Sequence, residues 1–326
     1  MKQLAKHAAN ILVTPPKHSA MNTERPPTID PQAAARWSHL RPALQGEASP
    51  WLHEEVARRM QERLQWLVLK PSRWVHWAPL RGGLQAHALV AKRYPQSECF
   101  LVDAQQQREQ LAHKLIAKPW WNPARWWGSA LRASTPAQPV QMVWANMALH
   151  MDADPQGLIA QWHSLLEADG FVMFSCLGPD TLRELRQVYA AQGWSVPSHE
   201  FTDMHDWGDM LVRAGFAEPV MDMERITLTF STPQTLLAEL RGLGRNLHPA
   251  RFQGLRGRAW LAQLHAALRK TLAQPAPDGP LHLSFEIIYG HAFKPRPRVA
   301  VQPQTTVSLA EMRQILLQNK AESSIL

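Results

Sequence analysis

Apolar runs alternate with amphipathic segments through the first two thirds of the chain. Four short runs have the length and composition of buried strands, at residues 73–78, 98–103, 140–145 and 171–176. Apolar residues recur every three or four positions, as on one face of a helix, at residues 54–68, 83–93, 104–117, 155–168 and 178–191. Asp180 is placed to cap the last of these helices. Strands that alternate with helices at this spacing predict an α/β fold, with a mostly parallel central sheet and helices on both faces.

The pattern changes after residue 200. Residues 206–214 indicate one more helix, while residues 219–230 and 281–289 alternate polar and apolar positions as strands do. We expect these two strands to pair antiparallel at the edge of the sheet. The residues between them, about 231–275, indicate a helical insertion.

The two ends of the chain differ from the segment between them. Residues 1–30 contain several prolines and little periodicity, so we expect a flexible N-terminal extension. Whether translation starts at Met1 or Met21 stays open. Residues 31–293 are expected to form the folded domain. Residues 294–326 indicate a Pro-rich tail with a short C-terminal helix, which a capping box from Ser308 to Glu311 would begin.

Composition limits the classes of function. The formal net charge is +8, which suits nucleic acid, anionic lipid or an acidic carrier protein, but the arginines are scattered, which favours a generally basic surface. No run of 18 apolar residues is present, so we expect no membrane-spanning helix. Cys99 and Cys176 lie in apolar strands and predict inert core thiols in a reducing cytoplasm. The histidines lack close metal-ligand spacing, so we expect no metal site.

Four stretches of sequence carry a recognisable signature. They are VWANMALH at residues 143–150, FSCLGPDTLRELR at 174–186, FTDMHD, LVRAGF and DME between 201 and 224, and FEIIYGHA at 285–292. Together they resemble the malonyl-acyl carrier protein O-methyltransferases of biotin biosynthesis. The resemblance implies the Rossmann-like class I methyltransferase fold over residues 31–293, and S-adenosylmethionine (SAM) as cofactor.

The resemblance also implies a reaction and a partner. The methyl acceptor would be the free carboxyl of a malonyl thioester, presented by acyl carrier protein, an acidic protein. This carboxylate is already ionised near neutral pH, so the enzyme must position and desolvate it rather than deprotonate it. We expect no nucleic-acid partner, because the chain carries no recognised motif for one.

Cofactor-binding residues follow from the resemblance. Gly82 and Gly83 would belong to the loop whose backbone approaches the cofactor. Asp103, at the end of the second strand, would receive the ribose hydroxyls, and Asn146, after the next long strand, would lie near the methionine part. Each has a structural alternative, because Asp103 could cap the next helix and Asn146 could form a turn.

Two arginines are candidate catalytic residues for the acceptor. Arg183 and Arg186 lie three apart on one predicted helix, near strand ends where ligands bind in open α/β sheets. Either guanidinium could form a bidentate pair with the malonyl carboxylate. The alternative is that both belong to a solvated helix face.

The glycine-rich loop departs from the family pattern. Trp77 stands at the position of an acidic residue, and Pro79 and Arg81 stand at two glycine positions. Residues 119–129, PWWNPARWWGS, replace the segment beside the adenine and could stack on a ligand or fill its pocket. Residues 45–47, QGE, replace an N-terminal Ser-Tyr-Asp. The alternative function is therefore a catalytically inactive protein with the methyltransferase fold that binds or regulates a partner.

Overall fold

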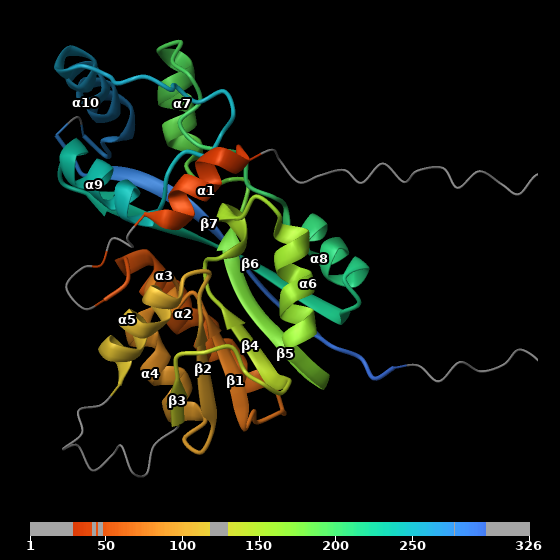
Figure 1. The fold of residues 1–326 in the computed structure, drawn as a ribbon. Coiled ribbons are helices and arrows are strands. Elements are labelled where there is room, and N and C mark those ends of the chain that lie inside the picture. The colour runs from red at the N-terminus through yellow and green to blue at the C-terminus, as the bar shows by residue number, and fades with distance from the viewer. Residues whose placement is uncertain (1–28, 41–43, 45–47, 118–129, 277, 298–326) are drawn as a thin grey trace, which may run out of the picture.

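A computed structural model describes residues 29–40, 44, 48–117, 130–276 and 278–297. These residues form a seven-stranded sheet in the order β3-β2-β1-β4-β5-β7-β6 (Figure 1). Its strands are β1 (Arg73–Trp77), β2 (Glu98–Val102), β3 (Ala130–Arg132), β4 (Val140–Ala145), β5 (Leu166–Leu177), β6 (Ala217–Phe230) and β7 (Leu281–Phe293). Strands β1 to β5 pair in parallel, whereas β7 is antiparallel to both β5 and β6. The predicted fold class is confirmed.

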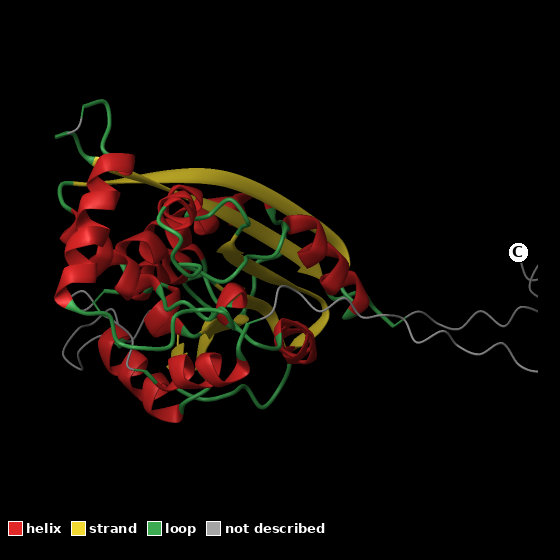
Figure 2. Cartoon of the chain, turned by 90° about the horizontal axis from the view of Figure 1, so that it is seen from above, coloured by secondary structure: helices red, strands yellow, loops and turns green. Residues whose placement is uncertain are grey.

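Helices cover both faces of the sheet, which is twisted, as the view from above shows (Figure 2). They are α1 (Pro31–His39), α2 (Trp51–Arg63), α3 (Pro79–Gly82), α4 (Leu84–Arg93), α5 (Gln106–Ile116), α6 (Pro155–Leu165), α7 (Arg183–Ala191), α8 (Met204–Arg213), α9 (Pro233–Leu243) and α10 (Arg258–Leu272). Two short 3₁₀ helices are η1 (Leu64–Trp66) and η3 (Leu149–Met151). None of the helices in the described ranges is long and apolar enough to cross a membrane.

Alternation along the strands divides the core into two layers. In β1, Trp74 packs with the helices α2 and α4, whereas Val75 and Trp77 face the layer formed with α6 and α8. Trp77 meets Trp162 of α6 edge to face, with ring centroids 6.2 Å apart. Buried Cys99 and Cys176 belong to these layers and are unpaired, as expected.

Some element boundaries differ from the prediction. The helix after β5 begins at Arg183, so Asp180 does not cap it; Leu182 is the N-cap residue, and Asp180 pairs with Arg225 of β6 at 2.7 Å. Helix α6 ends at Leu165 rather than at residue 168, because residues 166–170 already belong to the long strand β5.

Strand β3 and helix α1 were not predicted, nor were the short helices α3 and η3. The short edge strand β3 has too few residues to produce a pattern. Helix α1 begins at Asp30, whose carboxylate accepts from the amides of Gln32 and Ala33, and Pro31 occupies its first turn.

Helices α9 and α10 lie between β6 and β7 in the chain, where the insertion was expected. Leu264, Leu268 and Leu272 of α10 pack into the core layer that includes α7 and β7. The divisions near residues 30 and 294 stay predictions. The N-terminal extension, the C-terminal helix, residues 45–47 and the tryptophan-rich segment 119–129 fall largely or wholly outside the described residues.

Candidate functional site

The loops after β1, β2 and β4 meet at the carboxyl edge of the parallel strands, where open α/β sheets bind ligands. Asn146, the first residue after β4, connects the loop after β1 with α2 and β5. Its Nδ2 donates to the carbonyls of Gly82 and His53, each at 2.8 Å, and its Oδ1 accepts from the Ser175 hydroxyl at 2.6 Å. The side chain is buried, so it fixes the distance between the loop after β1 and the ends of β4 and β5.

Close packing explains both glycines of the loop. A Cβ at Gly82 would lie 3.2 Å from the carbonyl oxygens of Asn146 and Trp77, which is too close for backbone atoms. Gly83 has φ of +110°, a conformation that side chains disfavour. Gly82 and Gly83 lie in the loop after β1, and their positions favour glycine for structural reasons that do not involve a ligand.

Polar atoms of the segment before and within α2 bind this loop. The Ser49 hydroxyl accepts from the amides of Gly83 (3.2 Å) and Leu84 (3.1 Å) and donates to the Leu80 carbonyl at 3.0 Å. Glu54 accepts from the next two amides, those of residues 85 and 86. His53 Nδ1 donates to the Arg81 carbonyl at 2.7 Å. The donors at the start of α4, which would otherwise face a ligand, are therefore already bonded.

Asp103 follows β2 at the same edge and is almost fully buried. Its Oδ1 lies 3.5 Å from Nη1 of Arg108 and accepts from the Gln105 amide at 3.2 Å. Burial raises the pKa of the Asp103 carboxyl, and the charge of Arg108 opposes that shift. Asp103 thus has both the position predicted for a ribose acceptor and the bonds of a local structural role.

Arg81 lies between this carboxylate and α1. Its Nη2 donates to the carbonyls of Trp37 (3.0 Å) and Leu40 (3.1 Å), and its guanidinium lies 4.1 Å from the centroid of the Trp37 ring. Arg108 Nη2 donates to the same Leu40 carbonyl at 2.8 Å and to that of Ser38. Burial, with the nearby charge of Arg108, lowers the pKa of Arg81 to about 10. We refer to Trp37, Arg81, Asp103 and Arg108 as the Arg81 cluster.

Arg81 and Arg108 bind the C-terminal end of α1 from the side of the carboxyl edge, and the loop after α9 contacts α1 from the other side. Trp37 packs on Leu247, and Arg251 pairs with Asp30 at 2.7 Å. The Asp30 amide also donates to the Leu247 carbonyl at 2.9 Å. Figure 1 shows α1 above α3, with α9 to its left. Helix α1 therefore lies over the carboxyl edge of the strands, and we refer to it as the cover of the candidate site.

The two predicted acceptor arginines have different surroundings. Arg186 donates from Nη1 to the Thr181 carbonyl and from Nη2 to the Pro179 carbonyl, each at 2.6 Å. Arg183 is 45% exposed at its side chain and lies 3.3 Å from Glu184 and 3.9 Å from Asp180. Arg186 thus holds the turn before α7, whereas Arg183 presents its guanidinium to solvent.

Buried histidines occur behind the loop. Burial lowers the pKa of His53 to about 4 and that of His150 well below its ordinary value. His199 Nε2 donates to the His150 carbonyl at 2.8 Å. In the part of the chain that the structure describes, no group of His, Cys, Asp or Glu side chains is arranged to hold a metal ion.

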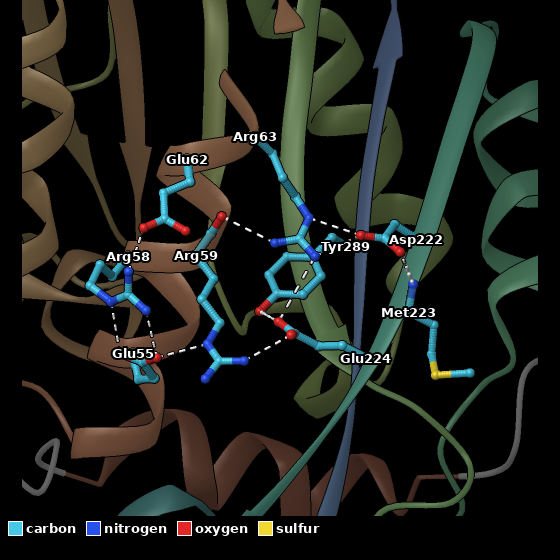
Figure 3. Close-up of polar contacts among 9 residues, drawn as sticks. All are labelled: Glu55, Arg58, Arg59, Glu62, Arg63, Asp222, Met223, Glu224 and Tyr289. Atoms are coloured by element: carbon cyan, nitrogen blue, oxygen red, sulfur yellow. Dashed lines mark hydrogen bonds and ion pairs between the residues drawn. The ribbon is translucent and has the colours of Figure 1, made fainter. Parts of the chain in front are cut away.

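Helix α2, which carries His53 and Glu54, is bound to the antiparallel edge by a network of charged groups (Figure 3). The Tyr289 hydroxyl donates to Glu224 Oε1 at 2.5 Å, and Arg59 contacts Glu224 Oε2 at 2.8 Å. Arg63 pairs with Asp222 at 2.6 Å and lies 3.7 Å from the centroid of the Tyr289 ring. This network positions α2, and through it the residues that bind the loop after β1.

Several residues of the site were missed by sequence reasoning. Trp37, Ser49 and Arg108 each contact segments at least 30 residues away, and their local sequence gives no sign of these contacts. The position of Glu54 in the first turn of α2 indicates its role only weakly. Acidic residues are common there because they interact favourably with the helix dipole, whether or not they bind a distant loop.

The curated relatives of this chain reported below share one name. The chain is 37% identical over 282 residues to a malonyl-[acyl-carrier protein] O-methyltransferase of Gallionella capsiferriformans, covering 82% of this chain and 92% of that protein. It is 34% identical to the protein of the same name from Laribacter hongkongensis, covering 82% and 91%. A putative methyltransferase of Bacillus halodurans, of known structure, is 14% identical with a TM-score of 0.47, covering 72% of this chain and 98% of that one. No protein-family model matches.

Proposed function

Because this chain belongs to the malonyl-[acyl-carrier protein] O-methyltransferase family, we propose that it methylates the free carboxyl of a malonyl thioester carried on acyl carrier protein. The methyl donor in this proposal is SAM. The observation that carries it is the family relationship over most of the chain, joined to the meeting of Gly82, Asp103 and Asn146 at one edge of the sheet. A cytoplasmic location is part of the proposal, and the buried, unpaired cysteines support it.

SAM would supply an electrophilic methyl group, and four residues are proposed to hold it. The backbone at Gly82 and Gly83 would lie along the cofactor, Asp103 would accept from the ribose hydroxyls, and Asn146 would face the methionine part. In the conformation described, these groups do not fit a bound cofactor. The Asn146 amide, the Gly82 carbonyl and the Gly83 amide are all bonded within the chain, and Arg108 lies against Asp103. Binding would require α1 to move away with Trp37 and Arg81 to turn outward.

For the acceptor carboxylate, we propose Arg183 as the direct partner, because its guanidinium is half exposed. Arg186 also stays in the proposed acceptor site. Its bonds to the carbonyls of Pro179 and Thr181 support a positioning role for the turn from which Arg183 projects. The substrate needs only to be oriented and shielded from water, since its carboxylate is ionised without a general base.

The Arg81 cluster favours a second candidate function, a relative that keeps the fold and binds a partner without methylating it. SAM is a cation at sulfur, and two guanidiniums already lie around the Asp103 carboxylate. Bringing a third positive group into a buried site is costly unless one of the arginines leaves.

Calorimetric titration with SAM and S-adenosylhomocysteine separates the two functions. Saturable binding followed by transfer of labelled methyl to malonyl-acyl carrier protein supports the enzyme. If the folded protein binds neither ligand, the enzymatic function is excluded and the partner-binding function is favoured. The acceptor is tested by comparing methyl transfer to malonyl-acyl carrier protein with transfer to the acetyl form, which lacks the free carboxyl.

A further inference from the structure

Charge is distributed unevenly along this protein. Residues 232–276, which comprise α9, α10 and the loop between them, carry seven Lys or Arg and one Asp or Glu. That segment supplies +6 of the formal net charge of +8. The basic residues are Arg241, Arg245, Arg251, Arg256, Arg258, Arg269 and Lys270. The excess of basic over acidic residues is therefore concentrated in the helical insertion.

Apolar side chains are exposed on the same loop. Leu255 is fully exposed, and Phe252 is 51% exposed. The guanidinium of Arg256 lies 4.3 Å from the Phe252 ring centroid and 4.1 Å from that of Trp260, so it links the loop to α10. Stacking of this kind fixes the exposed loop without burying its apolar tip. We define the docking surface as exposed Phe252 and Leu255 with the exposed arginines Arg241, Arg245 and Arg258.

Arg258 is placed where a helix does not favour it. It is the first residue of α10, next to the N-cap Gly257. The unpaired amides at a helix N-terminus carry partial positive charge, so a cation there opposes helix stability. An exposed cation at this position is available to a negatively charged partner.

The docking surface adjoins the cover of the candidate site. The loop that carries Phe252 and Leu255 also carries Leu247 and Arg251, which hold α1. Gly244, at the start of this loop, lies against Met151 in the 3₁₀ helix after β4. A protein bound to the docking surface would therefore stand next to α1 and the carboxyl edge of the strands.

We propose that the docking surface binds an acidic protein domain, the acyl carrier protein that presents the substrate. This inference rests on the proposed function. Two exposed apolar side chains among arginines suit a small protein interface, in which the apolar residues are buried and the rim charges select an acidic partner. Charge complementarity raises the association rate, so the affinity falls as ionic strength rises.

The test is the binding of fluorescently labelled malonyl-acyl carrier protein to the full chain without SAM, measured by anisotropy. The variant Arg241→Glu/Arg258→Glu is expected to raise the Kd at least tenfold, and Leu255→Ser at least threefold. The matched control Lys92→Glu/Lys114→Glu makes the same change of charge at exposed positions on α4 and α5 and is expected to change the Kd less than twofold. Arg258→Glu removes a cation from a helix N-terminus, which favours the helix, whereas Arg241→Glu places an anion in the last turn of α9, so circular dichroism checks that the double variant is folded.

The outcomes separate this inference from the proposed function. Equal Kd values for the wild type and the Arg241→Glu/Arg258→Glu variant overturn the docking surface, as does an equal loss in the control. Tighter binding of a single-stranded RNA than of the carrier protein, lost in the same variant, also overturns it in favour of nucleic acid. If the carrier protein binds through these arginines but no methyl transfer occurs, the docking surface is supported and the proposed enzymatic function is excluded. If the protein methylates malonyl-coenzyme A but does not bind the carrier protein, only the docking-surface proposal is excluded.

Discussion

Replacement of Arg81 by alanine is expected to open the candidate site. The guanidinium donates to two carbonyls of the α1 segment and lies on the Trp37 ring. Alanine removes all of these contacts, and it keeps the short helix α3 intact because it is the best helix former. Helix α1 would then be held at this edge mainly by Arg108 and by the loop after α9.

The size of the effect follows from the contacts. Hydrogen bonds from a charged donor contribute about 1.5–3 kcal/mol each, and water regained on opening offsets much of this. The cation–π contact adds roughly 0.5–2 kcal/mol. Together they favour the closed state by about 2–4 kcal/mol net, which at 1.4 kcal/mol per factor of ten weakens a ligand of the open state by roughly 30- to 1,000-fold. Since Arg108 would retain part of this closure, we expect Arg81→Ala to bind S-adenosylhomocysteine at least tenfold more tightly than the wild type.

Isothermal titration of both proteins measures this directly. Arg36→Ala is the matched control, because Arg36 is an exposed arginine in the last turn of α1. It removes the same charge and is expected to leave the affinity within twofold of the wild type. Limited proteolysis should also cut the Arg81→Ala variant faster near α1. If Arg81→Ala binds the ligand no more tightly than the wild type, the Arg81 cluster does not control access and the reasoning is refuted.

Three further predictions concern the framework of the site. Asn146→Ala leaves the carbonyls of Gly82 and His53 without their buried donor and should lower the free energy of unfolding by about 3 kcal/mol in urea denaturation; a loss below 1 kcal/mol would show that the loop relaxes freely. Tyr289→Phe removes the hydroxyl that donates to Glu224 and should cost about 1–2 kcal/mol by the same measurement, with Arg59→Ala in both backgrounds to test coupling. Burial lowers the pKa of His53 from 6.5 to about 4, so the unfolded chain binds the proton more readily than the folded one. The free energy of unfolding should therefore fall as the pH drops from 6.5 towards 4. His53→Asn, which keeps a donor but does not titrate, should show a shallower fall, and identical slopes in the two proteins would contradict this role of His53.

The parallel part of the sheet was predictable because its strands are apolar on both sides. The runs that became β1, β2, β4 and β5 are bounded by polar segments and by helices of suitable length, so few other arrangements suit them. Strand β3 has three residues that are exposed or half-buried, so it lacks the apolar pattern that identified the others.

Placement of the site was predictable, but its contacts were not. Gly82, Gly83, Asp103 and Asn146 follow three strands, and the topology alone brings strand ends together. Several of their partners, such as Ser49 and His53, precede β1 in the chain, and no local pattern indicates which carbonyl Arg81 will reach. Trp77, which stands at the position of an acidic residue in the family, directs its ring to Trp162 on the other face of the sheet, as the strand alternation requires.

The motifs that identify the family are largely framework. Glu224 and Tyr289, from two of the four signature stretches, bond to each other and to α2. Thr181, from a third, donates from its hydroxyl to the Glu286 carbonyl and accepts from the amide of the same residue, which joins the turn before α7 to β7. A chain can therefore keep these signatures for stability while its cofactor loop changes. Other signature residues, Asn146, Arg183 and Arg186, belong to the proposed site. Arg81 lies outside the signature stretches and leaves the framework bonds untouched, and we expect it to control access to the edge where the cofactor would bind.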